Sequence, residues 1–336
     1  MILGGILMSS KDFEYKRLLE LKKMTVQELS SYYRKLRSYE YDTNKKLESS
    51  EIKKKIYFLT NIILKIDRIL SGRKLILFDD KRNNNTSKGK IYASSHVGRY
   101  DIESAMESIG EQAYFVMGDP GETYRNMEGL FLDKLQGRIC VDTGYNIYDI
   151  FRKHQRGETL SAEEQALYDE YKKDRHICED MCTRRIANRD NILIYPEGAW
   201  NVTSRLTQSL FPGTARIAVK GNGVIIPIGI LRNKKKYTVN IGKEMDVAGA
   251  DDSDVKDITK ELKENMDSLV GEIIFSGDKT IARKSLGTPA QNENDFINDI
   301  MSESENDYTL DAIEKSRYYD SDAPENVFET KDRKRL

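Results

Sequence analysis

Between residues 90 and 242, short apolar segments alternate with longer stretches of helical character, and this alternation restricts the fold more than any other feature. The apolar segments span 90–95, 112–118, 138–142, 191–195, 224–231 and 237–242. Runs of this length are typical of strands, and strands that alternate with helices form parallel sheets. We therefore expect an α/β fold in which helices flank a largely parallel central sheet.

Residues 1–78 are predicted to form a basic helical segment. Thr25 and Glu28 make the T-x-x-E pattern of a capping box, which marks the start of a helix. Apolar residues then recur at helical spacing, at Leu29, Tyr32, Tyr33, Leu36 and Tyr39 and, further on, at Ile52, Ile56, Leu59, Ile63, Ile66 and Leu70. The second stripe either packs against the rest of the protein or enters a lipid interface.

Changes in composition divide the rest of the chain. The polar stretch 79–89 separates the helical segment from an α/β domain over residues 88–275, which a helix at 253–275 closes. Within this domain, residues 145–190 carry Glu and Lys at helical spacing and are long for a connection, so we expect an inserted helical hairpin. Residues 285–336 are acidic with few apolar anchors and are expected to form a disordered tail.

The formal net charge of −1 gives no general attraction to nucleic acid, and we expect no nucleic-acid partner. The charge is uneven, because residues 11–75 hold 17 Lys and Arg against 9 Asp and Glu, whereas residues 293–330 hold 2 against 12. A basic helical segment suits an anionic lipid surface, although a solvated helix face would carry the same charges.

The expected location is cytoplasmic, with peripheral attachment to the membrane through the N-terminal helices. No run reaches the ~18 apolar residues of a membrane span, and Met1–Met8 lacks the basic region and cleavage site of a signal peptide. Three cysteines without a framework indicate reduced thiols. Cys178 and Cys182 lie near His176 on an expected helix, but they lack an evident fourth ligand, so we expect buried thiols and no metal.

The segment Ser95-His96-Val97-Gly98-Arg99-Tyr100-Asp101 carries the candidate chemistry. It directly follows an apolar strand, so His96 is expected at the carboxyl end of that strand, where open α/β sheets place their sites. Asp101 would lie in the first turn of the next helix, where the helix dipole favours a carboxylate. A histidine held by an aspartate is a general base with a fixed tautomer.

Further segments follow in a fixed order: Gly137-Arg138-Ile139-Cys140-Val141-Asp142, Tyr195-Pro196-Glu197-Gly198, Phe211-Pro212-Gly213-Thr214-Ala215 and Ile225-Ile226-Pro227-Ile228. Together with the His96 segment they resemble the conserved blocks of the PlsC-type lysophosphatidate and glycerol-phosphate acyltransferases. The family forms are close to N-H-x-S-x-x-D, G-x-I-F-I-D-R, F-P-E-G-T-R, F-K-x-G-A and V-P-I-x-P. The resemblance covers residues 88–275.

The resemblance implies an O-acyltransferase in which His96 is the base and Asp101 its partner. The acceptor hydroxyl would attack the thioester carbonyl of acyl-CoA or acyl-carrier protein directly, so these carriers are co-substrates and no cofactor is expected. The acceptor would be a glycerophospholipid precursor similar to lysophosphatidate. Glu197 and Gly198 would help to hold it, and Pro196 and Pro227 would shape the pocket on the acyl-chain side.

The sequence departs from the family pattern at the positions where the family binds the acceptor phosphate. The family has Thr-Arg after its third block and Arg after its second, whereas this chain has Ala199-Trp200 and Thr143. Either other arginines take over, with Arg99, Arg138 and Arg205 as candidates, or the acceptor is another lipid or a glycan. Trp200 would then flank a lipid or stack on a sugar.

Two other functions stay open on the sequence. A catalytically silent member of the fold would bind lipid without transfer, and the missing arginines favour it. A hydrolase would use the same His96 base with water as the acceptor. The His96–Asp101 pair and Glu197 favour an enzyme over a silent module, because charged groups gathered in a pocket are typical of catalysis.

Overall fold

The computed structural model describes residues 23–49, 54–83, 86–97, 100–118, 137–141, 147, 150, 153–154, 157–198, 201, 206–233 and 235–276. The helices are α2 (Val26–Ser49), α3 (Lys54–Ser71), α4 (Asp101–Ile109), α7 (Ala162–Ala187), α8 (Gly213–Gly221) and α9 (Val255–Phe275). The strands are β1 (Lys74–Asp80), β2 (Lys90–Ser94), β3 (Tyr114–Gly118), β4 (Arg138–Val141), β5 (Ile192–Ile194), β6 (Val224–Asn233), β7 (Lys236–Ile241) and β8 (Met245–Asp246).

The strands form one sheet in the order β1-β7-β6-β2-β5-β3-β4, and β8 pairs with the start of β6. β2 lies parallel to both β5 and β6, and β3 lies parallel to both β4 and β5. β7 runs antiparallel to β6, and β1 is parallel to β7. The predicted α/β class with a largely parallel sheet is therefore confirmed. Every apolar segment predicted as a strand overlaps one.

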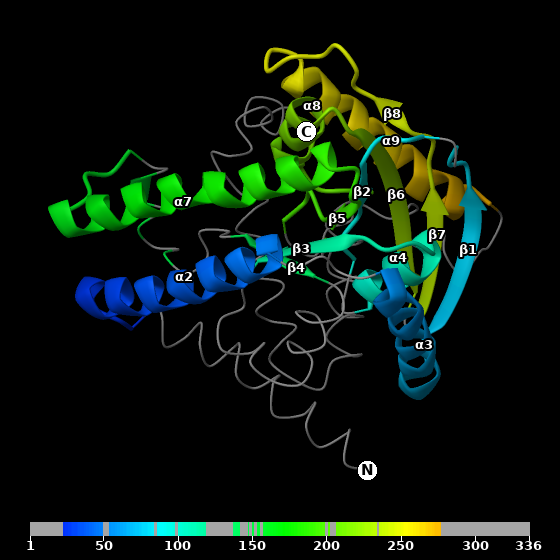
Figure 1. Ribbon diagram of the computed structural model, residues 1–336, viewed down its shortest axis with the longest axis horizontal. Coiled ribbons are helices and arrows are strands. Elements are labelled where there is room, and N and C mark those ends of the chain that lie inside the picture. The colour runs from blue at the N-terminus through cyan, green and yellow to red at the C-terminus, as the bar shows by residue number, and fades with distance from the viewer. Residues whose placement is uncertain are drawn as a thin grey trace.

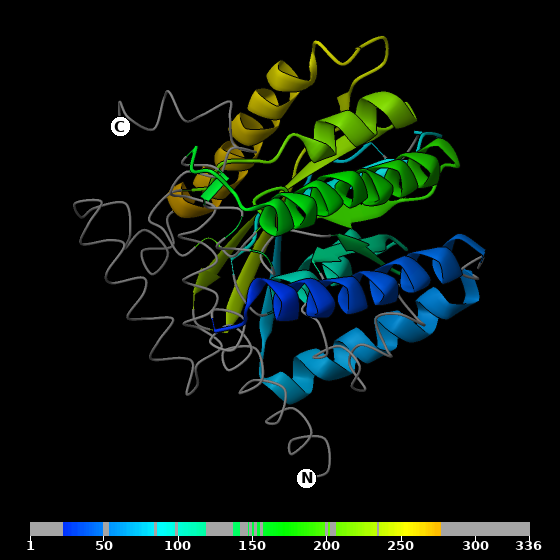
Figure 2. The ribbon, with the colours of Figure 1, turned by 90° about the vertical axis from the view of Figure 1, so that its left-hand side faces the viewer.

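Helices cover both faces of this sheet (Figures 1 and 2). α7, α8 and α9 pack on one face, where Ile91 and Ala93 of β2 join their apolar side chains in one core cluster. α4 packs on the other face beside α3, and Tyr92 of β2 belongs to that second cluster. Because successive side chains of a strand point to opposite faces, β2 is buried on both sides at the centre of the molecule.

The first described helix starts as the sequence predicts. The hydroxyl of Thr25 accepts a hydrogen bond from the N–H of Glu28, and the carboxylate of Glu28 accepts one from the N–H of Thr25, which completes the capping box. α2 then packs against β4 and α7, with Leu29 and Tyr33 buried beside Tyr168 of α7. This helix is an integral part of the fold.

α3, unlike α2, leaves much of its predicted apolar stripe exposed. Thr60 and Leu64 are buried, but three members of the predicted apolar stripe, Leu59, Ile66 and Leu70, are exposed. Within the described residues no helix is both long and apolar enough to cross a membrane.

The edge strand β1 was not predicted from the sequence. Residues 74–78 were expected to end the helical segment and 79–89 to form a loop, yet Lys74–Asp80 pair with β7 in the sheet. Among the described residues of the predicted insertion 145–190, α7 is one continuous helix in the connection from β4 to β5. Most of residues 145–156 lie outside the described residues, so the hairpin stays a prediction. The predicted tail 285–336 lies outside the described residues.

Candidate functional site

His96 follows β2 and lies at the edge of the sheet formed by the carboxyl ends of the central parallel strands. The strand pairs with β6 up to Ser94, and the N–H of Ser95 donates to the carbonyl of Ile228. The Ser95 hydroxyl then accepts a hydrogen bond of 2.7 Å from the N–H of Ile230. Ser95 is fully buried, so it anchors the backbone directly before His96.

His96 and Asp101 form the predicted pair. Nδ1 of His96 lies 2.8 Å from Oδ2 of Asp101, and the His96 side chain is 16% exposed while that of Asp101 is fully buried. An ionised carboxylate only accepts hydrogen bonds, so Nδ1 carries the proton in this pair. The N–H of Val97 donates to the same Asp101 oxygen over 2.6 Å. Asp101 is the first residue of α4, where the helix dipole stabilises its negative charge.

Tyr195, which sequence analysis did not single out, supports the His96 ring. The two ring centroids are 4.4 Å apart, and Tyr195 is buried directly after β5. Burial, followed by the negative charge of Asp101, holds the pKa of Tyr195 well above its usual value, so its hydroxyl keeps its proton. The aromatic face limits the rotation of His96 away from Asp101.

Glu197 binds the polypeptide itself rather than projecting into open space. One carboxylate oxygen accepts the N–H of His96 at 2.8 Å, and the other accepts the N–H of Gln208 at 2.7 Å. Glu197 is completely buried, and this burial raises its pKa to about 8, against the opposing effect of the two N–H donors. Glu197 therefore connects the His96 segment to the chain around Gln208, and these contacts give no support to its predicted role in holding the acceptor head.

The turn after β5 depends on a glycine. Gly198 has a φ of +71°, a conformation that residues with a side chain rarely adopt. A Cβ atom added there would lie 2.5 Å from Cε2 of Phe211. The carbonyl of Pro196 accepts the N–H of Phe211, which fixes this close approach. Pro196 and Gly198 therefore shape the backbone that presents Glu197.

Asn201 and Gln208 are functional neighbours that the sequence did not indicate. The N–H of Asn201 donates to the carbonyl of His96, and both Asn201 and Gln208 are buried. Their contacts to His96 and Glu197 run through backbone N–H groups. Since every residue type except proline offers such a group, no sequence signal could have identified these positions.

Arg138 is not brought to His96. Strand register places Arg138 in the row of Phe115, Leu193 and Tyr92, and Tyr92 precedes His96 by four residues. Arg138 thus lies about 13 Å behind His96 along the strands and three strands away. It is also almost completely buried. The described residues therefore give no support to its predicted contact with an acceptor phosphate.

The other residues expected near the acceptor, Arg99, Trp200 and Arg205, lie outside the described residues. The same holds for Gly98 and Thr143, at which the sequence departs from the family pattern.

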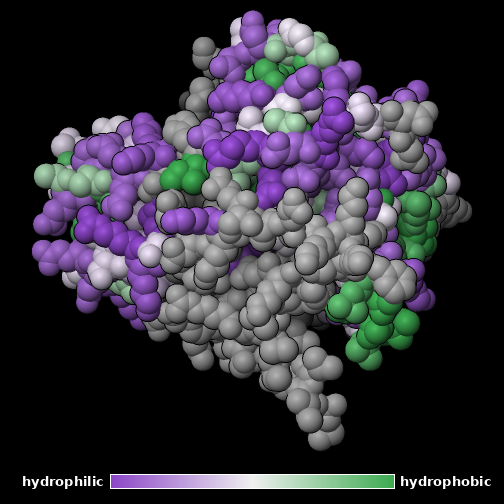
Figure 3. Space-filling view, in the orientation of Figure 1, coloured by the Kyte–Doolittle hydropathy of each residue, from purple (hydrophilic) through white to green (hydrophobic). Residues whose placement is uncertain are grey.

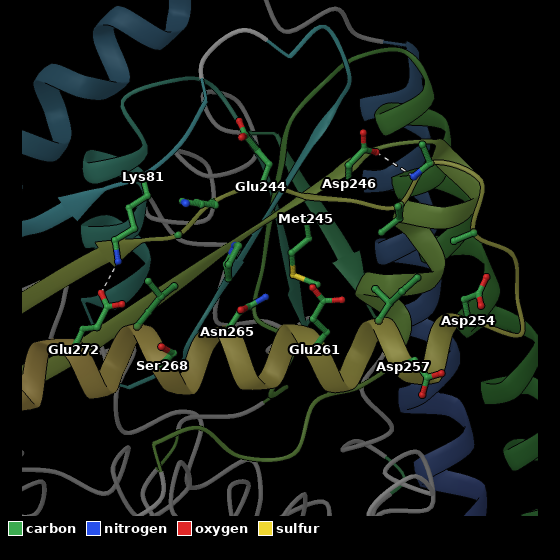
Figure 4. Close-up of a pocket in the computed structure, with 18 residues that line it drawn as sticks. Lys81, Glu244, Met245, Asp246, Asp254, Asp257, Glu261, Asn265, Ser268 and Glu272 are labelled. Carbon is green, nitrogen blue, oxygen red and sulfur yellow. Dashed lines mark hydrogen bonds and ion pairs between the residues drawn. The ribbon is translucent and has the colours of Figure 1, made fainter.

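A cavity of about 710 Å³ lies between α9 and the segment that follows β7 (Figure 4). Of the described predicted site residues, Pro227 lines it, whereas His96, Asp101 and Glu197 do not. Several acidic side chains face it, and Lys81 bonds Glu272 at 2.6 Å on its wall. An acidic lining disfavours an acyl chain. The cavity therefore gives no support to the predicted role of Pro227 on the acyl-chain side.

The cysteines lie in the core. Cys140, Cys178 and Cys182 are free and buried. A hydrogen bond that the Cys178 thiol donates to Cys182, together with burial, raises the pKa of Cys178 well above its usual value, so its thiol is protonated. Among the described residues, no cluster of three or more His, Cys, Asp and Glu side chains is arranged to hold a metal ion.

Comparison with known proteins finds similar solved structures but no related sequence. No family model and no curated protein matches the chain. The crystal structure of the 1-acyl-sn-glycerophosphate (LPA) acyltransferase PlsC from Thermotoga maritima is similar at 14% sequence identity and a TM-score of 0.46, over 73% of this chain and 94% of that one.

Proposed function

We propose that this protein is an O-acyltransferase in which His96 is the general base. The observation that carries the proposal is the 2.8 Å contact between Nδ1 of His96 and Oδ2 of Asp101 at the carboxyl edge of the sheet. Nδ1 is engaged by Asp101, so Nε2 is assigned the proton transfer. Asp101 fixes the ring and stabilises the imidazolium that forms.

The reaction proceeds by direct attack. Nε2 of His96 takes the proton of the acceptor hydroxyl as its oxygen bonds to the thioester carbonyl carbon. The tetrahedral intermediate then expels the thiolate of the carrier, which takes the proton back from His96. The products are an ester and the free thiol of coenzyme A or of acyl-carrier protein. The chain needs no nucleophile of its own because the acceptor supplies it.

The proposed acceptor is the hydroxyl of a glycerophospholipid precursor, by the resemblance of the sequence blocks to the PlsC-type enzymes. Another lipid or a glycan is the alternative acceptor, because Thr143 and Trp200 replace the arginines of the family pattern. The proposed site of action is a membrane surface, because an acceptor that carries an acyl chain would itself lie in the membrane.

A silent lipid-binding module fits the structure less well. The pair of His96 and Asp101 is within hydrogen-bond reach, and Glu197, Tyr195 and Ser95 each restrain the His96 segment. Burying a carboxyl group costs free energy, and a module that only binds lipid gains nothing from holding a histidine in one tautomer.

The test is mass spectrometry of the products made by the purified full-length protein. Palmitoyl-CoA and palmitoyl-acyl-carrier protein serve as donors, with a panel of lysophospholipids, glycerol phosphate and sugars as acceptors. We expect a new ester, which His96→Ala reduces by about 10²- to 10⁴-fold. His154→Ala is the matched control, because His154 is exposed and stacks on Tyr168 of α7.

Each result separates the candidates. An ester that persists in His96→Ala contradicts the general-base assignment. Free fatty acid without an ester indicates a hydrolase that uses water as the acceptor. No product with any donor or acceptor, from a protein that is folded, indicates the silent module.

A further inference from the structure

α3 and β1 together expose an apolar surface. Its members, which we call the α3–β1 surface, are Leu59, Ile62, Ile66, Ile69 and Leu70 of α3 and Leu77 of β1. Leu77 faces the same side of the sheet as Leu75, which packs in the cluster that contains Leu64 of α3. Ile69 and Leu70 are 75% and 72% exposed. Figure 3 shows the corresponding apolar areas close together at the right of the molecule, over α3 and beside β1. Single exposed apolar side chains are common, but several on one side of a helix mark an interaction surface.

Lysines border the α3–β1 surface. Lys65 of α3 and Lys74 of β1 are exposed. Lys235, in the turn between β6 and β7, is exposed as well, and its Nζ donates to the carbonyl of Ser71 at the end of α3 over 3.1 Å. Lys236 pairs with Lys74 across the strands. Apolar side chains with a cationic border match the chemistry of an anionic lipid interface.

The surface begins at the same edge of the sheet as His96. Ser95, which precedes His96, bonds the N–H of Ile230, and β6 continues for three residues beyond it, about 10 Å. At that end of β6, Asn233 pairs with Lys236, which pairs with Lys74. In Figure 1 both β7 and β1 point upward, so the ends of β2 and β6 lie below, where α3 and α4 lie.

We propose that the α3–β1 surface docks on an anionic lipid bilayer and holds the His96 edge of the sheet at the membrane. This inference rests on the proposed function for the role of His96. Ile69 and Leu70 enter the interface at the end of α3, and the neighbouring lysines bind the lipid phosphates. A lipid acceptor then reaches His96 without leaving the bilayer surface.

A second copy of this chain fits the surface less well. An interface with two-fold symmetry brings the same patch of both copies together. The cationic border of one copy, Lys65, Lys74, Lys235 and Lys236, would then face that of the other. Like charges brought together at an interface oppose association, whereas an anionic bilayer neutralises the whole border.

The experiment is flotation of the full-length protein with lipid vesicles. One set contains phosphatidylcholine alone, and the other contains phosphatidylcholine mixed with phosphatidylglycerol. We expect binding to the anionic vesicles that weakens with added salt. Ile69→Ser with Leu70→Ser lowers the partition coefficient about tenfold or more, because two apolar side chains leave the interface. Lys65→Gln with Lys74→Gln lowers it about tenfold on anionic vesicles only.

Matched controls lie on other faces of the molecule. Ile177→Ser removes an exposed apolar side chain of α7, and Lys173→Gln with Lys256→Gln removes two exposed charges on α7 and α9. The proposal requires that these variants bind as the wild type does. Circular dichroism and thermal unfolding establish that each variant is folded.

Two results would overturn the inference. The first is equal vesicle binding by the wild type and by the Ile69→Ser, Leu70→Ser variant, or no binding by either. The second is a wild-type dimer that the same variant converts to a monomer, which would make a second copy the occupant.

Failure of this inference differs from failure of the proposed function. Ester formation with a water-soluble acceptor tests His96 alone, and the surface variants should retain it at the wild-type rate. Ester formation without vesicle binding would contradict the proposed docking surface and would support the proposed acyltransferase activity. Vesicle binding through the α3–β1 surface without ester formation on any acceptor would support the docking surface and would contradict the proposed acyltransferase activity.

Discussion

At the scale of single residues, the site is built from contacts that hold the backbone of His96 as firmly as its ring. Asp101 bonds both the His96 ring and the N–H of Val97, and Glu197 bonds the N–H of His96. Glu197 does so from a position without solvent exposure. The position of the base is therefore set by two carboxyl groups, one at the start of α4 and the other in the turn after β5.

The buried carboxyl group of Glu197 makes stability depend on pH. Its pKa in the folded protein is about 8, above the ordinary 4.5, so the folded state binds a proton that the unfolded state has released. Stability from this group is complete below pH 4.5 and is lost as the pH rises through 8. We expect the free energy of unfolding to fall between pH 5 and pH 8 more steeply in the wild type than in Glu197→Gln, by up to about 1.4 kcal/mol per pH unit.

Urea denaturation of both proteins across this pH range measures the difference. Other titrating groups are shared, so their effects cancel in the comparison. Parallel pH profiles would show that Glu197 is ionised in the folded state.

Gly198 is predicted to be intolerant of a side chain. Gly198→Ala places a methyl group against Phe211 in a backbone conformation that alanine disfavours, so we expect a loss of about 2 kcal/mol in stability. Gly213→Ala is the control, because nothing lies within 4 Å of its added Cβ and the residue starts α8. Denaturant unfolding measures the stability of both variants. Equal stability of the two would disprove the assigned role of the turn.

At the scale of elements, α4 is tied to the turn between α3 and β1. Nη1 of Arg73 donates to the Ser104 hydroxyl at 2.9 Å, and its guanidinium lies 3.7 Å from the carboxylate of Glu107. Arg68 of α3 also contacts Glu107, at 3.0 Å. Since Asp101 begins α4, these contacts connect the helix that orients His96 to the α3–β1 surface.

The buried Arg73 is predicted to be essential to this junction. Arg73→Met leaves Glu107 with less positive charge in a buried setting, and we expect a loss of about 3 kcal/mol in the free energy of unfolding. The double variant Arg73→Met, Glu107→Gln should recover part of that loss, because the uncompensated carboxylate is gone. A double-mutant cycle in urea measures both. Additive losses would mean that the two residues do not interact.

Elements also differ in how far their sequence pattern decides their environment. α2 and α3 both carry apolar residues at helical spacing, yet Leu29 and Tyr33 of α2 are buried while Ile66 and Leu70 of α3 are exposed. Periodicity predicts a helix and its apolar side. Whether another part of the protein covers that side depends on where the helix lies relative to the sheet.

At the scale of the whole molecule, α2 belongs to the folded unit. Leu29 and Tyr33 fill a cluster with Leu167, Tyr168 and Tyr171 of α7. Removal of residues 1–75 would therefore be a poor test of membrane attachment, because it would also take α2 from this cluster and remove the first residues of β1.

Deletion of residues 1–49 is predicted to destabilise the protein by about 3–6 kcal/mol, since it uncovers at least two large apolar contacts. Urea denaturation together with binding of a hydrophobic dye measures the effect. Ile62→Ser in the full-length chain is the control, because Ile62 is exposed on α3 and its loss should leave stability unchanged. Unaltered stability of the truncated protein would contradict the structural role of α2.

The sequence by itself determined the α/β class, the strands that overlap β2 to β7, the capping box of α2 and the pair of His96 and Asp101. These features depend on patterns that are local in the chain: apolar runs, helical spacing and residues five apart across one strand-to-helix turn. A local pattern carries its own geometry, so it can be recognised without the rest of the molecule.

Only the tertiary structure decided the edge strand β1, the burial of Glu197, the backbone donors at Asn201 and Gln208, and the distance of Arg138 from His96. Each depends on which segments the fold brings together. Strand register moved Arg138 away because its row in the sheet is set by pairing with Phe115, and pairing between distant segments leaves no trace in local spacing.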